Sequence, residues 1–266
     1  MKLELISRLH SDGPSRPSIV LVHGACMAAW VWKDNFMPYL FEKGFNVYAI
    51  SLRNHGSSAA NANLRFTSVK DYVEDVNTIV NAIEGQVLLI GHSMGGFTLQ
   101  HYMNQLSAEK IRAIVLLCAV PPAGLWQLIP KLIRDYPFHF LISCLRMSWL
   151  PIIRDDARLK ELMFSKNFPI EKMKTIMPLI QEESFLAFLE MVFMRLPKVK
   201  RSPVPVMVVG AGNDYLISRS STKKMADHYN AAFKMVDSAS HCFMSEPGWE
   251  EVAEEISSFF KAKIAK

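Results

Sequence analysis

Short and nearly continuous apolar runs alternate along the chain with longer stretches in which apolar residues recur every three or four positions. The apolar runs occupy residues 18–22, 45–50, 86–90, 113–118 and 204–209, and a helical pattern covers residues 68–84. Continuous apolarity is typical of strands covered on both faces, and therefore of a mostly parallel sheet. Residues 2–10 and 233–236 add expected outer strands and residues 249–260 a closing helix. The pattern therefore predicts a doubly wound, mostly parallel α/β domain.

This alternation is interrupted between residues 122 and 196, where the sequence is helical, poor in strands and rich in Met, Phe, Trp and Leu. We expect a core formed by residues 1–121 and 197–266, with a helical cap, or lid, of residues 122–196 inserted after strand 6. Such an insertion would lie over the carboxyl ends of the strands, where open α/β sheets bind ligands. The alternative is that its Met and Phe side chains are ordinary core of a second helical layer.

The composition fits one sizeable domain and excludes several other classes of protein. The chain has 266 residues and a net charge of +5, and its basic residues form no tract that would indicate a nucleic-acid partner. Residues 1–12 are charged and lack the apolar segment of a signal peptide, so we expect a cytoplasmic protein. The apolar stretch at residues 138–145 is too short to span a membrane, so no membrane span is expected. The four cysteines form no C-x-x-C pair and are interpreted as free thiols, and nothing in the pattern indicates an oligomeric state.

A nucleophile motif follows the third apolar run. Residues 91–95 read Gly-His-Ser-Met-Gly, directly before a helical run at residues 96–103. A serine on a sharp turn from strand to helix needs small neighbours, and it presents its hydroxyl at a helix N-terminus, where a developing anion is stabilised. A glycine-rich turn without chemistry is the alternative, but the context favours Ser93 as a nucleophile.

A serine hydroxyl needs a base, and four histidines follow Ser93 in the chain. His101 falls on the helix after the motif, His139 in the insertion and His228 on a helical segment, so each is interpreted as a surface or core residue. His241 lies in a loop after the last strand and before the last helix. Because that loop is at the carboxyl edge of the sheet, we expect His241 to be the base.

The base needs an acid that fixes its tautomer, and the acid should follow the end of a strand. Asp214 ends the segment Gly-Ala-Gly-Asn-Asp directly after the run at residues 204–209. Asp227 is on a helical segment, and Asp237 is too close in sequence to His241 to reach its ring easily. Asp214 is therefore the expected acid.

Backbone amides near the motif are the expected oxyanion donors. The segment His-Gly-Ala-Cys at residues 23–26 follows the first apolar run, which predicts that the N–H groups of Ala25 and Met94 form the oxyanion hole. Cys26 has no activating signature and is interpreted as an inert buried thiol. The residues expected to line the substrate pocket are Met27, Trp126, Leu216 and Phe243.

With GHSMGG at residues 91–96, HGAC at residues 23–26 and the loops that carry Asp214 and His241, the chain resembles the α/β-hydrolase superfamily. HGACMAAW (23–30) and HCFMSEP (241–247) are similar to the plant methylesterase and hydroxynitrile lyase group, and SLRNHGSS (51–58) resembles small bacterial hydrolases and monoacylglycerol lipases. The chain departs from the family at Ser51, where Asp is frequent, and at Asn54, where Gly is frequent. Met27-Ala28-Ala29 also replaces a His-Gly-Gly run.

The residues and the resemblance together predict a serine hydrolase that cleaves a carboxylic ester with an apolar acyl or aromatic part through an acyl-enzyme. Motifs for nucleotide or metal cofactors are absent from the sequence, so neither a cofactor nor a metal is implied, and the expected partner is a small-molecule ester. Two alternatives remain: a lyase or carbon–carbon hydrolase with the same triad, and a ligand receptor of this fold with weak activity. Hydroxynitrile lyases of the similar group carry Lys in the loop after the histidine, where this chain has Glu246, and usually Thr where it has Gly24.

Overall fold

The computed structural model describes residues 2–59, 63–105, 110–198 and 201–264, and within these ranges the strands form one seven-stranded sheet. The strands are β1 (Glu4–Arg8), β2 (Ser18–Val22), β3 (Asn46–Ser51), β4 (Val87–His92), β5 (Ile111–Leu117), β6 (Val206–Ala211) and β7 (Ala232–Val236). Their order in the sheet is β1-β3-β2-β4-β5-β6-β7. The outer strand β1 pairs antiparallel with β3, and all other pairs are parallel.

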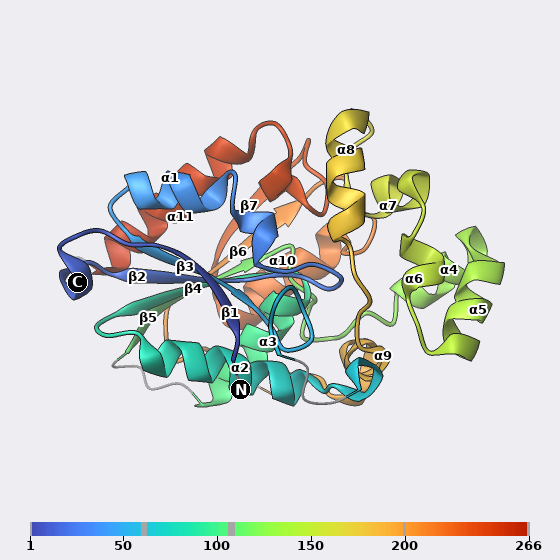
Figure 1. Ribbon diagram of the computed structural model, residues 1–266, viewed down its shortest axis with the longest axis horizontal. Helices are drawn as coiled ribbons and strands as arrows, with labels where there is room; N and C mark the ends of the chain where they lie inside the picture. The colour runs from blue at the N-terminus through green and yellow to red at the C-terminus, as the bar shows by residue number, and fades with distance from the viewer. Residues whose placement is uncertain (1, 60–62, 106–109, 199–200, 265–266) are drawn as a thin grey trace.

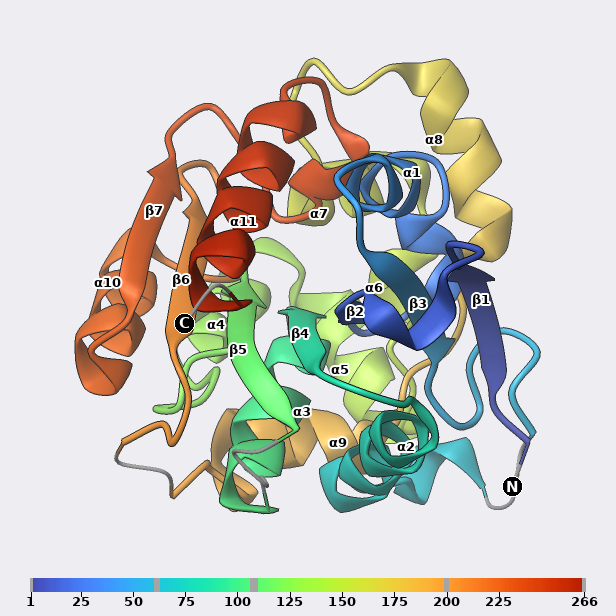
Figure 2. The same ribbon diagram turned by 90° about the vertical axis from the view of Figure 1, so that its left-hand side faces the viewer.

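Helices cover both faces of this sheet. Figures 1 and 2 show α1 and α11 on one side of the sheet and α2 and α3 on the other, with α4 to α9 gathered toward one end. Every residue of β2, β4 and β6 is buried, as expected for strands covered on both faces. The helices are α1 (Phe36–Glu42), α2 (Val69–Ala82), α3 (Met94–Tyr102), α4 (Leu128–Asp135), α5 (Pro137–Arg146), α6 (Leu150–Ile153), α7 (Asp156–Met163), α8 (Ile170–Ile176), α9 (Phe185–Leu189), α10 (Arg219–Tyr229) and α11 (Trp249–Ile264).

The predicted doubly wound, mostly parallel α/β architecture is confirmed, with strand ends that differ by one or two residues from the apolar runs. The helices α4 to α9 all lie between β5 and β6. In chain order this helical segment therefore follows the fifth strand, and its predicted place after strand 6 is corrected. Met1 and residues 265–266, at the outer ends of the expected core, lie outside the described residues.

The N-terminus of α2 joins the helical segment to the sheet domain. Ser68 and Asp71 form a capping box, which satisfies amide groups that the first turn leaves free. Glu190, only 3% exposed, also accepts hydrogen bonds there from the hydroxyl of Ser68 (2.9 Å) and the N–H of Val69 (2.7 Å). A carboxylate is favoured at the positive end of a helix dipole, so this contact anchors the end of the helical segment on α2.

None of the helices in the described ranges combines the length and the apolar character needed to cross a bilayer.

Candidate active site

Ser93 occupies a strained turn between β4 and α3. Its φ of 50° and ψ of −115° lie outside the regions that a serine normally adopts, and such strain is typical of residues held for function. Two glycines make the turn possible. A Cβ on Gly91 would come within 2.7 Å of the backbone of Gly95, and a Cβ on Gly95 would lie 2.5 Å from the carbonyl oxygens of Val22 and His23. The turn is therefore pressed against the end of β2, and larger side chains would push it away.

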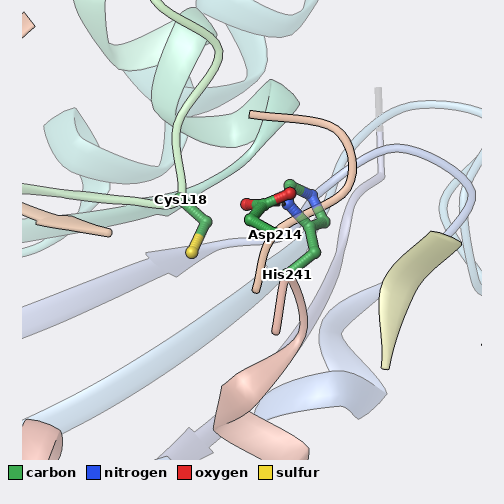
Figure 3. A group of neighbouring side chains, drawn as sticks. All are labelled: Cys118, Asp214 and His241. Carbon is green, nitrogen blue, oxygen red and sulfur yellow. Dashed lines mark hydrogen bonds and ion pairs between the residues drawn. The ribbon is translucent and has the colours of Figure 1, made fainter. Parts of the chain in front are cut away.

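His241 and Asp214 meet at the same edge of the sheet, although 27 residues separate them (Figure 3). The distance from His241 Nδ1 to Asp214 Oδ2 is 2.7 Å, and each side chain is 1% exposed. The other carboxylate oxygen, Oδ1, accepts hydrogen bonds from the backbone N–H groups of Leu216 (2.8 Å) and Ile217 (2.9 Å). Asp214 is thus surrounded by donors that hold its carboxylate in place against the imidazole ring.

Ser93 and His241 both line one cavity at the carboxyl edge of the sheet. Within the described structure no hydrogen bond joins the hydroxyl of Ser93 to the ring of His241. Such contacts are often long without substrate and tighten in the complex. With Nδ1 committed to Asp214, the atom of His241 left for a proton from Ser93 is Nε2.

The expected oxyanion donors also lie at this cavity. Ala25 lines it, and Met94 is the first residue of α3, where helical N–H groups have no partner within the helix. Neither amide has an acceptor in the described part of the chain. A Cβ on Gly24 would lie 3.1 Å from Cβ of Ser93, so the backbone before Ala25 runs directly past the serine.

The histidines and aspartates that were not expected to be catalytic do not line this cavity. His101 is on α3, His139 on α5 and His228 on α10, and none of the three lines it. Asp227 pairs with Lys223 on the surface of α10. The carboxylate of Asp237 is 78% exposed and pairs with Arg219.

The four residues expected to line the substrate pocket divide into two pairs. Met27 and Leu216 line the cavity. The predictions for Trp126 and Phe243 are wrong, because neither side chain lines the cavity. The side chain of Trp126 is 57% exposed, and its neighbour Leu125 points into the cavity instead. Phe243 is 2% exposed and belongs to the hydrophobic core.

Cys118 stands beside the pair of Asp214 and His241, and these three form a group of metal-ligand type within the described residues (Figure 3). Their ligand atoms lie within 4.8 Å of one another. Burial, together with the nearby charge of Asp214, raises the pKa of the Cys118 thiol, which keeps it protonated and a poor ligand. A metal ion would also have to displace the hydrogen bond between Asp214 and His241. The donor set therefore fits an acid and base pair with a neutral thiol neighbour better than a metal site.

His92, which precedes Ser93, is a residue whose role the sequence did not reveal. Its ring is fully buried, and its Nε2 lies 3.1 Å from the backbone carbonyl of His241. Burial, and then the neighbouring His241, lower the pKa of His92, so its ring is neutral and Nε2 carries the proton that it donates to this carbonyl. His92 thereby links the turn of Ser93 to the loop of His241.

A buried carboxylate from the helical segment also reaches the cavity, and sequence reasoning missed it entirely. Glu183 is 1% exposed and lines the cavity. Its Oε2 accepts hydrogen bonds from the N–H of Cys26 (3.1 Å) and from Nε2 of His55 (2.9 Å). Its Oε1 accepts from the hydroxyl of Tyr72 (2.7 Å) and from the N–H of Ser184 (2.7 Å). Glu183 therefore ties the loop after β2, next to the expected oxyanion donor, to the helical segment.

The charges of Glu183 and His55 stabilise each other. Burial alone would raise the pKa of Glu183, but the charge of His55 and the hydrogen bonds from its donors lower it to about 2. Burial alone would lower the pKa of His55, but the Glu183 carboxylate raises it. Each charge therefore favours the ionised form of its partner, and the two side chains form a buried pair. The only signal in the sequence is two adjacent acids, Glu182 and Glu183, within an apolar insertion, and nothing there identifies partners more than 100 residues away.

Comparisons with known proteins identify the family to which the chain is similar. The family described as "Alpha/beta hydrolase family" matches residues 19–255. Polyneuridine aldehyde esterase of Rauvolfia serpentina is 36% identical over 139 residues, which cover 49% of this chain and 48% of that protein. Methylesterase 3 of Arabidopsis thaliana is 30% identical over 128 residues, which cover 46% of this chain and 48% of that protein. The chain thus spans about half the length of these two curated relatives.

Solved structures show the same fold over nearly the whole chain. An esterase from Exiguobacterium antarcticum superimposes with a TM-score of 0.73 at 17% sequence identity, covering 97% of this chain and 95% of that one.

Substitution of Glu183 by Gln is expected to lower the free energy of unfolding at pH 7 by about 3 kcal/mol, because an amide NH₂ would face donors and the buried His55 would lose the carboxylate that stabilises its charged form. Since the pKa of Glu183 falls from 4.5 to about 2 on folding, its contribution is present above pH 4.5 and is lost as the pH falls toward 2. The difference in free energy of unfolding between wild type and variant should therefore become smaller in acid, as measured by denaturant unfolding. Glu171→Gln, at a side chain 79% exposed, is the control and should change stability by less than about 0.5 kcal/mol. A difference in free energy of unfolding that does not change with pH would contradict an interaction between the charges of Glu183 and His55.

Proposed function

The chain belongs to the alpha/beta hydrolase family, and on that premise we propose that it is a serine hydrolase that cleaves carboxylic esters with an apolar acyl or aromatic part. Ser93 is the nucleophile, His241 the base and Asp214 the acid that orients the base. The observation that carries the proposal is the buried hydrogen bond of 2.7 Å between His241 and Asp214, at the cavity that also receives the strained Ser93.

The reaction follows from this arrangement in two acyl transfers. The oxygen of Ser93 attacks the ester carbonyl while His241 Nε2 takes its proton, and the carboxylate of Asp214 stabilises the imidazolium that forms. The N–H groups of Ala25 and Met94 bind the oxyanion of the tetrahedral intermediate. His241 then protonates the departing alcohol. A water molecule, activated by the same histidine, releases the acid from Ser93.

The walls of the cavity support an apolar acyl or aromatic substrate. Apart from Ser93, His92, His241 and Glu183, the lining side chains are hydrophobic, and the four acceptor positions of Glu183 are already occupied by its own partners. A polar acyl chain would lose its water there without gaining new hydrogen bonds. The similarity to polyneuridine aldehyde esterase and to methylesterase 3, both esterases by name, supports an ester substrate.

Residues 122–196 are the proposed cap over this site. Leu128 and Leu132 of α4 and Ile152 and Ile153 of α6 line the cavity opposite Ser93. The helical segment therefore supplies the wall that excludes water from the acyl-enzyme and sets the shape of the acyl pocket.

The charges around the cavity favour hydrolysis over cyanohydrin cleavage. Cyanide is an anionic leaving group and needs a nearby cation, but no Lys or Arg lines the cavity in the described structure. Glu246, which replaces the lysine of the similar lyases, is 4% exposed, and its carboxylate accepts a hydrogen bond from the N–H of Ser165 at 2.7 Å. The carboxylate of Glu246 is thus bonded to the loop after α7, and Glu246 supplies no positive charge for the cyanide leaving group.

Ser93→Ala should abolish ester hydrolysis and leave the fold intact, because the change removes one oxygen that has no hydrogen-bond partner in the described structure. We expect a loss of kcat of about 10⁶ for p-nitrophenyl esters of graded chain length, with an unchanged melting temperature. Retention of more than about a hundredth of the wild-type rate would exclude Ser93 as the nucleophile. A wild-type protein that binds esters and turns over none of them would favour a ligand receptor.

Asp214→Asn should lower kcat by about 10⁴, because an amide NH₂ beside Nδ1 forces the proton of His241 onto Nε2, where the base must accept one. Asp227→Asn and Asp237→Asn change the same functional group at exposed side chains and serve as matched controls, with kcat expected within about twofold of wild type. Steady-state kinetics of the three variants decide the assignment. A larger loss at Asp237 than at Asp214 would overturn it.

Cyanide release separates the two reactions directly. With mandelonitrile or acetone cyanohydrin as substrate, the wild-type protein should release no cyanide above the uncatalysed background, since the cavity holds no cation for the leaving group. The same preparation should hydrolyse p-nitrophenyl esters. Cyanide release faster than the hydrolysis of every ester tried would favour the lyase.

A further inference from the structure

The helix α5 carries its apolar stripe on the outside of the molecule. Phe138, Leu141, Ile142 and Leu145 follow the spacing i, i+3, i+4, i+7 that normally faces a core, yet they are 76%, 55%, 39% and 77% exposed. The residue that α5 buries is the polar Ser143, 0% exposed, whose hydroxyl has no hydrogen-bond partner in the described structure. Phe140 of the same helix packs partly buried against the core, so α5 carries apolar side chains on both faces, and we name the four exposed apolar residues the α5 stripe.

The stripe lies at the end of the molecule farthest from α1, on the outer edge of the helical segment (Figure 1, right). The adjoining helix α4 adds an exposed apolar side chain, Ile133, which is 51% exposed. Exposed apolar surface gathered in this way is unusual for a protein that is surrounded only by water, and it marks a contact with another apolar phase or partner.

The charges around the stripe indicate what covers it. Between residues 128 and 158 the chain carries five basic side chains and three acidic ones, of which Asp135 is paired with Arg134. Arg146, the last residue of α5, is exposed and has no ion-pair partner among the described residues. An apolar helical stripe that ends at an unpaired arginine fits a lipid surface with anionic headgroups, because the side chains of the stripe enter the acyl boundary while Arg146 reaches the phosphates.

A second copy of the chain fits less well. In a two-fold symmetric dimer the same patch meets itself, so one interface would hold two copies of the unpaired Arg146 and no acidic side chain of α5 to balance them. We therefore propose that the α5 stripe is a docking surface for an anionic phospholipid bilayer.

The position of the stripe has a consequence for substrate access. Helices α4 and α6 line the cavity of Ser93, and both also contact α5, which carries the stripe. Docking would bring apolar esters dissolved in the bilayer close to the cavity, a step that rests on the proposed function. The docking itself does not, since it is measured without turnover.

Cosedimentation with vesicles tests the proposal on the whole protein. Vesicles of equal parts phosphatidylcholine and phosphatidylglycerol should bind the protein at least about tenfold more tightly than vesicles of phosphatidylcholine alone, and added salt should weaken the binding. The double variant Leu141→Glu with Leu145→Glu should lose at least about tenfold in affinity, because it places carboxylates in the acyl boundary. Its control is Phe66→Glu with Leu179→Glu, which changes the charge equally at side chains that are 58% and 47% exposed outside α5.

A label on α5 gives a second measurement that does not depend on a substitution. Cys144 is exposed, whereas the other three cysteines are buried, so a thiol-reactive, environment-sensitive fluorophore should label α5 selectively in the folded protein. Its emission should shift to the blue on addition of the anionic vesicles and remain unchanged with phosphatidylcholine alone.

Three results would overturn the proposal. They are the absence of binding to anionic vesicles, an equal loss of binding in the control variant, and a dimer that forms without lipid and is abolished by the two α5 substitutions. Because each variant changes exposed side chains only, its melting temperature should match that of the wild type. If a variant does not fold, Arg146→Gln takes its place in the binding experiment. That substitution should weaken binding to anionic vesicles and leave binding to phosphatidylcholine vesicles unchanged. None of these results depends on whether Ser93 hydrolyses esters.

Discussion

The close approach of the turn at Ser93 to the end of β2 is the constraint on which the rest of the site depends. Because Gly95 has no side chain, the carbonyl groups of Val22 and His23 can lie close to its Cα. Gly24 likewise allows the segment after β2 to pass beside Ser93. This contact holds the serine in its strained conformation, and Ala25 lines the same cavity as Ser93. A parallel sheet makes the contact possible, because it brings the carboxyl ends of neighbouring strands to one edge.

A second set of buried contacts joins the sheet domain to the helical segment. Glu183 holds the N–H of Cys26 with its carboxylate, and the N–H of Gln181 donates to the carbonyl of the same cysteine at 3.1 Å. Cys26, at a φ of 64°, is thus fixed on both sides by the segment 181–183. Buried ions are stable only when their hydrogen bonds are complete, so this loop and the helical segment adopt their positions together. The expected oxyanion donor Ala25 directly precedes this fixed residue.

The helical segment serves two surfaces with opposite requirements. Its inner sides present Leu128, Leu132 and Ile153 to the cavity, while α5 presents an apolar stripe to the outside. The inner face of α5 packs Phe140 against the core, so the exposed stripe is apolar surface in excess of what this packing needs. The proposed docking on a bilayer would remove this apolar area from water.

Much of this protein follows from its sequence alone, because strands and sharp turns depend on neighbouring residues. Continuous apolar runs predicted the parallel sheet, and the five residues around Ser93 predicted the turn, since periodicity and glycine spacing are local properties. Asn54 adopts a φ of 64°, which fits the frequent glycine of the family at this place. The tertiary structure alone decided that Trp126 faces solvent, that Glu183 finds its partners across more than 100 residues and that α5 is turned outward. These features depend on how whole elements pack against one another, and the periodicity of a helix states which residues share a face but not which face meets the core.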